Sequence, residues 1–403
     1  MRSNSRAIAR LLLACCAFVA ITNASPVAAG QSLSDVFLSP RFAHLGLAPL
    51  GPALASTVAS TYPVASASSS VAFVYNRELD TVERRPGPLG PILGERAETI
   101  GQGQFDLALT YSFVNLTTIN GEPLDHLVNA PRVNGRFLFF PVPGGTTLKG
   151  GRFTTLLPVR VALDIGVEAH IVSPSVTYGV TPDLDINLTV PIVRTSLDMQ
   201  TRTRIPDPRF PSFMLSPGNP LAGTQVQSAS ASSAGVGDVL LRAKYVLWRG
   251  DPVDVAAGLG LSLPTGRADD FQGAGTTRVE PGLIASRVFG TWLELLANAG
   301  IALDAEDVGR SVVQWAIGAT VMPIEQVAVP IVFLGRNELS PPTEPIANPF
   351  FFQIERSDTV DASVGVRWRF AENAVLSANA LVPLNHQGLR ADVIPTFEVE
   401  WTF

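Results

Sequence analysis

The sequence predicts an all-β protein: a transmembrane, antiparallel, up-and-down β-barrel of about twelve strands. Three observations lead to this fold. Apolar residues alternate with polar ones over many segments, tight turns alternate with long connections, and the chain ends with an aromatic residue on an amphipathic strand. No apolar run long enough for a membrane-spanning helix follows the N-terminus, which argues against a helical membrane protein.

The C-terminal residues predict the last strand of the barrel. Apolar residues occupy every second position from Val393 to Phe403, and mostly polar residues, among them Glu398 and Glu400, lie between them. A period of two places the two sets on opposite faces of a strand. The terminal Phe403 is typical of the signal that outer-membrane barrels present to the barrel assembly machinery, so this machinery and outer-membrane lipid are predicted partners.

The N-terminus has the pattern of a secretory signal peptide, residues 1–29. Three arginines precede the apolar run from Leu11 to Ile21, and small residues follow it. This order is typical of a signal peptide, and the run is too short for a membrane anchor. Cleavage is expected after Ala29, with Ala24 as the alternative.

Both cysteines, Cys15 and Cys16, lie in this segment, so the mature chain is expected to contain no disulfide. Residues 12–15 loosely resemble a lipoprotein signal. However, Arg10 lies too close to Cys15 to leave room for an apolar core, which favours an ordinary signal peptide.

The composition excludes some classes of function. Of 403 residues only 16% are charged. Without the three arginines of the signal peptide, the chain has 26 of its 29 basic residues against 35 acidic ones, so its net charge is negative. Nucleic acid is therefore not an expected partner. A high apolar content distributed as alternation is what a membrane barrel requires, because one face of each strand meets lipid.

Residues 30–100 are predicted to form an N-terminal periplasmic segment. Residues 51–70 are mostly small, and residues 84–103 are repeatedly interrupted by Pro and Gly. Two interpretations remain open. The segment is either a plug that enters the barrel from the periplasm or a disordered leader.

Residues 101–403 are predicted to form the barrel. Phe105, Leu107, Leu109, Tyr111 and Phe113 share one face of the first strand, and the same alternation recurs along the chain. Later strands are expected near residues 184–192, 239–247, 253–263, 279–289, 292–303, 311–322, 326–335, 358–370, 374–384 and 393–403.

The connections predict the orientation of the barrel. Tight turns are expected near residues 181–183, 249–252, 289–291, 323–325 and 371–373, and long loops at 117–153, 194–236, 265–278, 304–310, 336–357 and 385–392. Short periplasmic turns and long outer loops are typical of outer-membrane barrels. This alternation requires one long strand over residues 155–180. Because its apolar positions change parity, a bulge is expected near His170 to Pro174.

Aromatic residues support the same orientation. Barrels carry aromatic girdles at the membrane interfaces, and those near the tight turns are Phe105, Tyr178, Tyr245, Phe289, Trp368, Phe370, Trp401 and Phe403. A secreted β-sandwich would also have alternating strands. It would explain neither the one-sided loop lengths nor the terminal aromatic.

Three segments resemble a known family. Residues 173–193 (SPSVTYGVTPDLDINLTVPIV), 235–248 (GVGDVLLRAKYVLW) and 259–266 (LGLSLPTG) are similar to the family named for the MetA pathway of phenol degradation. The resemblance implies an outer-membrane barrel of the transporter type and is clearest over residues 155–320. A looser similarity connects the family to long-chain fatty-acid channels, which have an N-terminal hatch. The motifs are structural and specify the barrel rather than its cargo.

Several charged residues are expected to point into the lumen. Arg242, Lys244, Arg367 and Arg369 fall in the periplasmic half and are the candidates for a basic constriction. The alternative is that inward charges pair across neighbouring strands and fill a small barrel.

Apolar clusters in the predicted outer loops are candidates for a substrate vestibule, since exposed apolar patches mark binding surfaces. Their aromatic members are Phe139, Phe140, Phe210, Phe213, Phe350, Phe351 and Phe352. Alternatively, these loops fold inward and cap the barrel.

No catalytic, cofactor or metal site is expected. His170 and Ser173 are the only close pair of base and nucleophile, and their spacing places them on opposite faces of a strand. The predicted function is therefore an outer-membrane channel, not an enzyme, for passive uptake of small hydrophobic or aromatic molecules. The alternative is a non-transporting barrel with an adhesion or structural role through its outer loops.

Overall fold

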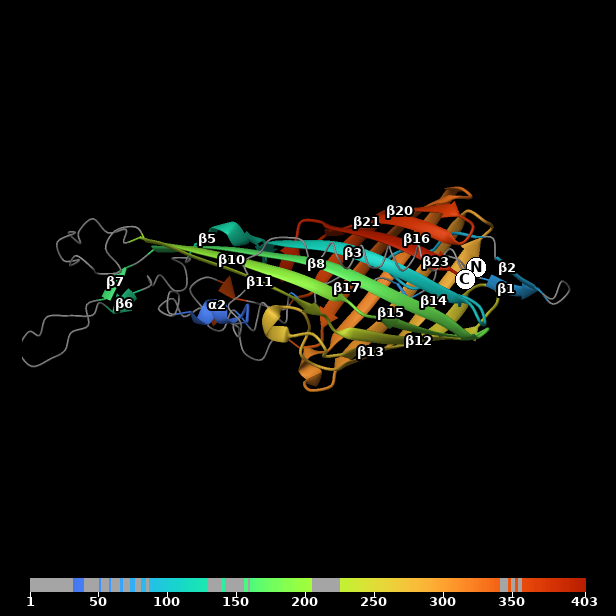
Figure 1. Ribbon diagram of the computed structural model, residues 1–403, viewed down its shortest axis with the longest axis horizontal. Helices are drawn as coiled ribbons and strands as arrows, with labels where there is room; N and C mark the ends of the chain where they lie inside the picture. The colour runs from blue at the N-terminus through green and yellow to red at the C-terminus, as the bar shows by residue number, and fades with distance from the viewer. Residues whose placement is uncertain are drawn as a thin grey trace, which may run out of the picture.

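The computed structural model describes residues 32–39, 51, 58, 66–67, 73–76, 81–84, 87–128, 139–141, 156–158, 160–204, 225–340, 347–348, 352–353 and 357–403. These residues form a closed antiparallel β-barrel of twelve strands, which confirms the predicted fold class (Figure 1). No helix among them is long and apolar enough to cross a membrane.

The wall consists of strands joined in sequence order. In two of the twelve, a short interruption divides the strand into two parts, β9 with β10 and β11 with β12. The strands are β3 (Phe105–Ile119), β8 (Arg160–Thr181), β9 (Leu184–Thr189), β10 (Ile192–Arg204), β11 (Gln225–Val236), β12 (Val239–Trp248), β13 (Asp254–Leu263), β14 (Arg278–Phe289), β15 (Leu293–Asp304), β16 (Val312–Ile324), β17 (Val327–Glu338), β20 (Thr359–Ala371), β21 (Ala374–Pro383) and β23 (Ile394–Thr402).

Smaller elements lie outside the wall or in its connections. They are the helix α2 (Asp35–Leu38), the 3-10 turns η2 (Leu124–His126), η4 (Ala268–Asp270) and η5 (Val308–Arg310), and the short strands β1 (Phe73–Asn76), β2 (Thr81–Arg84), β4 (Glu122–Pro123), β5 (Leu127–Val128), β6 (Phe139–Pro141), β7 (Leu156–Pro158), β18 (Ala347–Asn348), β19 (Phe352–Gln353) and β22 (Leu389–Ala391).

The barrel closes where the last strand pairs with the first. β23 runs antiparallel to β3, with Phe397 opposite Tyr111. At the end of this seam the backbone N–H of Phe403 donates to the carbonyl of Phe105 at 2.7 Å, and the N–H of Phe105 donates to Phe403 at 2.9 Å. The polar residues of β23 are buried in the interior, and its apolar residues from Pro395 to Trp401 face outward, as the alternation predicted; Ile394 at the start of the strand is buried in the apolar core.

The two ends of the barrel differ. At one, called here the short-turn end, the connections are residues 182–183, 249–253, 290–292, 325–326 and 372–373. At the other, the long-loop end, β8, β10 and β11 extend well beyond the rest of the wall (Figure 1). The predicted alternation of short and long connections is therefore present.

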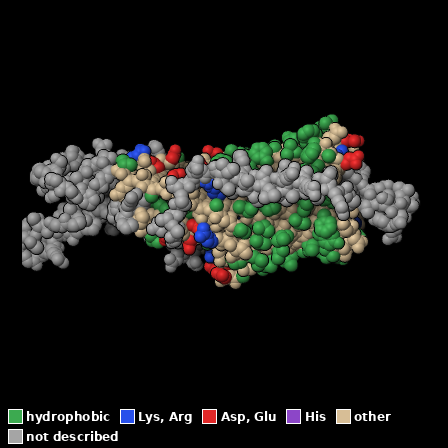
Figure 2. All heavy atoms as spheres, in the orientation of Figure 1, with side chains coloured by type: hydrophobic (Ala, Val, Ile, Leu, Met, Phe, Trp, Pro, Cys, Tyr) green, Lys and Arg blue, Asp and Glu red, His purple; other side chains and the backbone are tan. Residues whose placement is uncertain are grey.

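The outer face of the wall is apolar. Figure 2 shows hydrophobic side chains gathered over one part of the barrel, with charged side chains on either side of this belt. At the short-turn end, Trp368 and Phe370 lie with ring centroids 6.0 Å apart, and Phe105 lies 4.5 Å from Tyr178. Both pairs belong to the predicted aromatic girdle. An apolar outer belt is what contact with lipid requires.

The bulge predicted near His170 to Pro174 is wrong. β8 pairs with β3 in an uninterrupted register from Val167 to Tyr178. Odd-numbered residues of β8 face inward throughout, and Leu163 and Thr177 are both buried. What changes is the chemistry of the two faces. The inner face is apolar near the long-loop end and polar near the short-turn end, and Val176 is exposed on the outer face.

The prediction of one long loop over residues 194–236 is also wrong in its bounds. β10 continues to Arg204 and β11 begins at Gln225. Leu197 and Met199 of β10, with Ala229 and Ala231 of β11, pack into an apolar core at the long-loop end. The outward residues of both strands are mostly polar, so the apolar alternation of a lipid-facing strand is missing here.

This apolar core includes residues far apart in the sequence. Val114 of β3 and Leu163 of β8 belong to it, together with Leu33 and Phe37 from the N-terminal part of the chain and Phe271 from the loop between β13 and β14. The N-terminal residues 32–38 are therefore held at the long-loop end.

Candidate functional site

Residues 87–100, called here the inner segment, lie inside the barrel in the short-turn half. Most of them are buried. Side chains of the wall hold the backbone of this segment: the N–H of Ala97 donates to Oγ of Ser286 at 3.0 Å, and the N–H of Ile100 donates to Asp185 at 3.0 Å. These contacts satisfy backbone groups that a regular strand or helix would otherwise pair.

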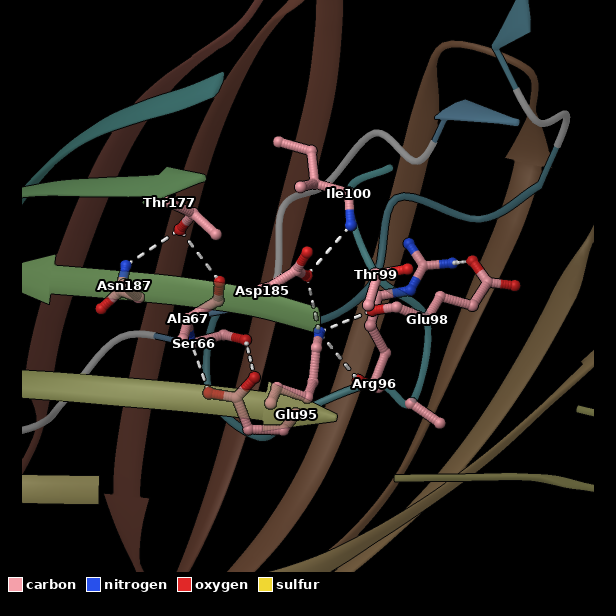
Figure 3. Close-up of polar contacts among 12 residues, drawn as sticks. Ser66, Ala67, Glu95, Arg96, Glu98, Thr99, Ile100, Thr177, Asp185 and Asn187 are labelled. Atoms are coloured by element: carbon pink, nitrogen blue, oxygen red, sulfur yellow. Dashed lines mark hydrogen bonds and ion pairs between the residues drawn. The ribbon is translucent and has the colours of Figure 1, made fainter. Parts of the chain in front are cut away.

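Lys244 of β12 is one of the wall residues that bind the inner segment. Its Nζ donates to the carbonyls of Glu98 at 2.5 Å and Arg96 at 3.2 Å, and it lies 3.7 Å from the carboxylate of Asp185 on β9. These three partners of Lys244 are labelled in Figure 3. The ammonium group thus has oxygen partners in the interior, as a buried charge requires.

Arg367 of β20 binds the inner segment from another part of the wall. It is 1% exposed. Its Nη1 donates to the carbonyl of Pro91 at 2.9 Å, and its Nη2 lies 3.1 Å from Glu398 and 2.8 Å from Glu400. Two carboxylates of β23 therefore orient a guanidinium that bonds to the inner segment.

The inner segment also places charges of its own against the wall. Arg96 is ion-paired with Glu98 at 2.6 Å and with Glu294 of β15 at 3.3 Å. Glu95 lies 3.5 Å from Arg242 of β12. The interior at this level is a mixed network of both signs.

Three of the four predicted constriction residues, Arg242, Lys244 and Arg367, therefore meet at the inner segment. The fourth, Arg369, is buried at the short-turn end, where its guanidinium interacts electrostatically with Glu325. Whether the four form a constriction of an open pore stays a prediction.

A plug was one of the two interpretations of residues 30–100, but the contacts that residues 87–100 make with the wall could not be read from their sequence. Parity identified the wall residues that point inward, because a strand has a period of two. The inner segment has no period, and its Pro and Gly residues indicated only an irregular chain. The acidic residues Glu95 and Glu98 were the one available signal, since they complement inward arginine and lysine side chains.

A cavity of about 450 Å³ lies in the lumen between the inner segment and the loop from residue 264 to 277. Leu93, Gly94 and Glu95 line it on one side, and Gln272 and Ala274 on the other. Inward residues of the wall complete it, including Ile171, Val193, Leu240, Arg242, Gly258, Gly260, Arg278, Glu280, Gly282, Gly300, Gln314, Leu334, Arg336, Asp361, Leu381 and Arg390.

The loop 264–277 folds over the lumen because it is hydrogen-bonded to residues 237 and 238, directly before β12. The carboxylate of Asp238 accepts the N–H groups of Gly266 at 3.0 Å and Ala274 at 2.7 Å. Thr265 donates from its hydroxyl to the carbonyl of Gly237 at 2.6 Å. A Cβ on Gly266 would lie 2.6 Å from the carbonyl oxygen of Gln272, so glycine is required. Gly237-Asp238 and Pro264-Thr265-Gly266, which belong to the family-like segments of the sequence, are thus hydrogen-bonded to each other.

This loop also binds the N-terminal part of the chain. The N–H of Leu33 donates to the carboxylate of Asp270 at 3.0 Å, and both the N–H and the hydroxyl of Ser34 donate to the carbonyl of Asp269 at 3.0 Å. The long-loop end is therefore narrowed by residues 32–38 and the loop 264–277 together.

The predicted vestibule lies mostly outside the described residues. Phe210, Phe213, Phe350 and Phe351 fall there. Phe139 and Phe140 belong to β6 and Phe352 to β19, and the structure describes the backbone but not the side chains of these strands. The vestibule therefore stays a prediction.

His170 and Ser173 lie on opposite faces of β8, as expected. The imidazole of His170 is hydrogen-bonded to the hydroxyl of Tyr111 at 2.9 Å, while Ser173 lines the lumen cavity. Within the described part of the chain, no group of His, Cys, Asp and Glu side chains has the arrangement of a metal site.

A closed barrel with an apolar outer belt and a polar interior defines the protein as an outer-membrane β-barrel protein. Residues 146–321 match the family described as "Putative MetA-pathway of phenol degradation", which confirms the predicted resemblance. Comparison with the curated proteins gives no match.

Among solved structures, the chain resembles the COG4313 outer membrane channel from Pseudomonas putida F1, with 11% identity, a TM-score of 0.46, and coverage of 76% of this chain and 98% of that one. It also resembles the Ralstonia pickettii toluene transporter TbuX, with 11% identity, a TM-score of 0.35, and coverage of 75% and 90%. A Pseudomonas aeruginosa FadL homologue gives 12% identity, a TM-score of 0.34, and the same coverage.

Proposed function

We propose that the protein is an outer-membrane channel for the passive uptake of small hydrophobic or aromatic compounds. The signal peptide is residues 1–29, residues 30–100 form a plug, and residues 101–403 form the barrel. The short-turn end faces the periplasm and the long-loop end faces the outside.

One observation carries this proposal. The lumen in the short-turn half is occupied by the inner segment, which is a separate stretch of chain and not a set of wall side chains. A barrel filled by its own wall residues would have no path to open. Residues 87–100 are joined to the barrel wall along the chain only through β3, so such a path opens once the segment moves.

The chemistry of the lumen supports a cargo with apolar surface. Aliphatic side chains of the wall, including Ile171, Val193 and Leu381, line the cavity together with backbone exposed at glycines. Charged side chains, among them Arg242, Glu280 and Arg336, line the same cavity, so a cargo would meet both apolar and polar contacts, as in small-molecule sites. The predicted vestibule phenylalanines would capture such compounds from the outside. Arg242, Lys244, Arg367 and Arg369 would line the open path below.

The proposal is tested by planar-bilayer conductance of the refolded protein with and without residues 30–100. We expect the shortened protein to conduct steadily and the full chain to conduct little. Both proteins must first migrate faster on a gel without boiling than with it, because a folded barrel resists detergent. A folded, shortened barrel without conductance would contradict the proposal and favour the adhesion or structural role.

A further inference from the structure

Glu95 closes the lumen cavity on its short-turn side, and its carboxylate has several partners. Oε1 accepts the N–H of Ala67 at 2.7 Å, and Oε2 accepts the hydroxyl of Ser66 at 3.0 Å (Figure 3). Oε1 also lies 3.5 Å from Nη1 of Arg242. The side chain of Glu95 is 23% exposed and that of Arg242 is 17% exposed, so both are accessible from the cavity that they line.

The wall fixes the orientation of the Arg242 guanidinium. Its Nε and Nη2 donate to Oδ1 of Asn187 at 3.2 and 3.0 Å, and Nη2 also donates to the hydroxyl of Thr189 at 3.2 Å. Because these two neighbours on β9 hold one edge of the planar group, Nη1 is directed toward Glu95. A guanidinium with a fixed orientation binds a carboxylate more strongly than a freely rotating one.

We propose that this cavity is a binding site for a small monocarboxylate with an apolar body, and that the ligand competes with Glu95 for Arg242. The inference rests on the channel function proposed above and names a ligand class for its lumen. The resting structure already holds a carboxylate against Arg242, namely that of Glu95. The site is therefore built for this chemistry and is occupied from within the chain.

The wall beside Arg242 suits the apolar body of such a ligand. Gly258 of β13 lies opposite Gly282 of β14, and Gly282 lies opposite Gly300 of β15, all three on the inner face. The three glycines themselves carry no side chain, and Cδ1 of Ile284 lies 3.4 Å from where a Cβ on Gly258 would be, so the wall offers backbone and an aliphatic surface to the ligand. The cavity volume of about 450 Å³ is within the range of small-molecule sites.

If the ligand competes with Glu95 for Arg242, substitutions of these two residues should change the affinity for a carboxylate in opposite directions. Removing the charge of Glu95 removes the internal competitor, so an added carboxylate should bind more tightly. Removing the charge of Arg242 should abolish the preference for a carboxylate. A general loosening of the inner segment would also admit a ligand, and Glu98→Gln provides the matched control, because Glu98 is ion-paired with Arg96 and not with Arg242.

The experiment is a calorimetric titration of the full-length protein in detergent with benzoate, with benzamide as its neutral counterpart, and with acetate, which lacks the apolar body. Wild type, Glu95→Gln, Arg242→Gln and Glu98→Gln are compared, each after its heat-modified gel mobility has been verified. Arg242→Lys replaces Arg242→Gln if the latter does not fold, and it should weaken the benzoate preference.

We expect benzoate to bind more tightly than both benzamide and acetate, and Glu95→Gln to raise benzoate affinity by about tenfold, which corresponds to one charge-assisted contact. Arg242→Gln should bind benzoate and benzamide equally. Equal binding of the two compounds by wild type would overturn the proposal. An increase in Glu98→Gln as large as in Glu95→Gln would do the same.

The outcome is separable from that of the channel proposal. A shortened barrel that conducts while the full chain shows no benzoate preference leaves the channel standing and removes the carboxylate site. Benzoate binding with the predicted pattern in a barrel that never conducts keeps the site and removes the channel.

Discussion

Asn298 of β15 holds Glu95 by both of its backbone groups. Its Oδ1 accepts the Glu95 N–H at 2.8 Å, and its Nδ2 donates to the Glu95 carbonyl at 2.8 Å. A side-chain amide thus takes the place that a neighbouring strand has in a sheet. The inner segment is irregular, and this contact shows how the wall satisfies its backbone without regular structure.

Replacing Asn298 with Ala should loosen the inner segment. The N–H and the carbonyl of Glu95, both part-buried, lose their partner, which costs at most about 1–3 kcal/mol for each group. We expect a higher open probability in planar bilayers than for wild type. Asn379→Ala is the control, because Asn379 also points inward but is hydrogen-bonded to Ser363 of the wall. Equal conductance of both variants would indicate that this contact does not hold the segment.

Replacing Arg367 with Met should destabilise the folded barrel. Glu398 and Glu400 would remain buried without their guanidinium, and breaking a buried ion pair in this way costs about 3–5 kcal/mol. The temperature at which the fast-migrating gel band converts to the slow one should fall. Adding Glu398→Gln and Glu400→Gln should restore part of the loss. If the two glutamines did not raise the conversion temperature again, unpaired carboxylates would not be the cause of the lost stability.

Deleting Phe403 should reduce the amount of protein inserted in the outer membrane. Its backbone makes the last two hydrogen bonds of the seam with Phe105, and its ring belongs to the aromatic girdle. Outer-membrane abundance, measured by immunoblot, is compared with that after Phe397→Leu, which keeps an apolar residue on the same strand. Wild-type abundance of the shortened chain would show that this residue is dispensable.

Replacing Asp238 with Ala should release the loop 264–277 from the lumen. The N–H groups of Gly266 and Ala274 lose their common acceptor. Trypsin should then cleave after Arg267 faster than in wild type, as mass spectrometry of the fragments would reveal. Asp251→Ala at the short-turn end is the control and should leave this rate unchanged. Unaltered cleavage in Asp238→Ala would mean that other contacts suffice to hold the loop.

The wall could be predicted from sequence because each strand has two chemically different faces. In β23 the inward position of Glu398 and the outward position of Phe397 follow from the period of two. The same rule failed at Leu163 and Ile165, which are apolar and face inward. Beyond the lipid-facing belt the interior of the barrel is an apolar core, so polarity no longer reports which face is inside.

The contacts of the lumen could be predicted only in part. Parity placed Lys244 in the interior, but its partners, the carbonyls of Arg96 and Glu98, belong to a segment without periodicity. Phe271 is a single aromatic residue in a loop, and nothing in its neighbours indicated that it would be fully buried in the core. Such contacts depend on tertiary packing, which local patterns do not encode.

The central claim is that movement of the inner segment opens the channel, and a reversible cross-link tests it most directly. The N–H of Ala97 donates to Ser286 Oγ at 3.0 Å, and Ala97 packs with Val246, Ala256 and Ile284 of the wall. Ala97→Cys with Ser286→Cys therefore introduces one thiol on each side of the contact between segment and wall. The mature chain is expected to contain no other cysteine. Single-channel conductance of the double variant is measured before and after addition of a reductant, with Ala97→Cys alone as control. We predict a closed channel when the disulfide is formed and openings after reduction. Equal conductance in the two states would contradict the account.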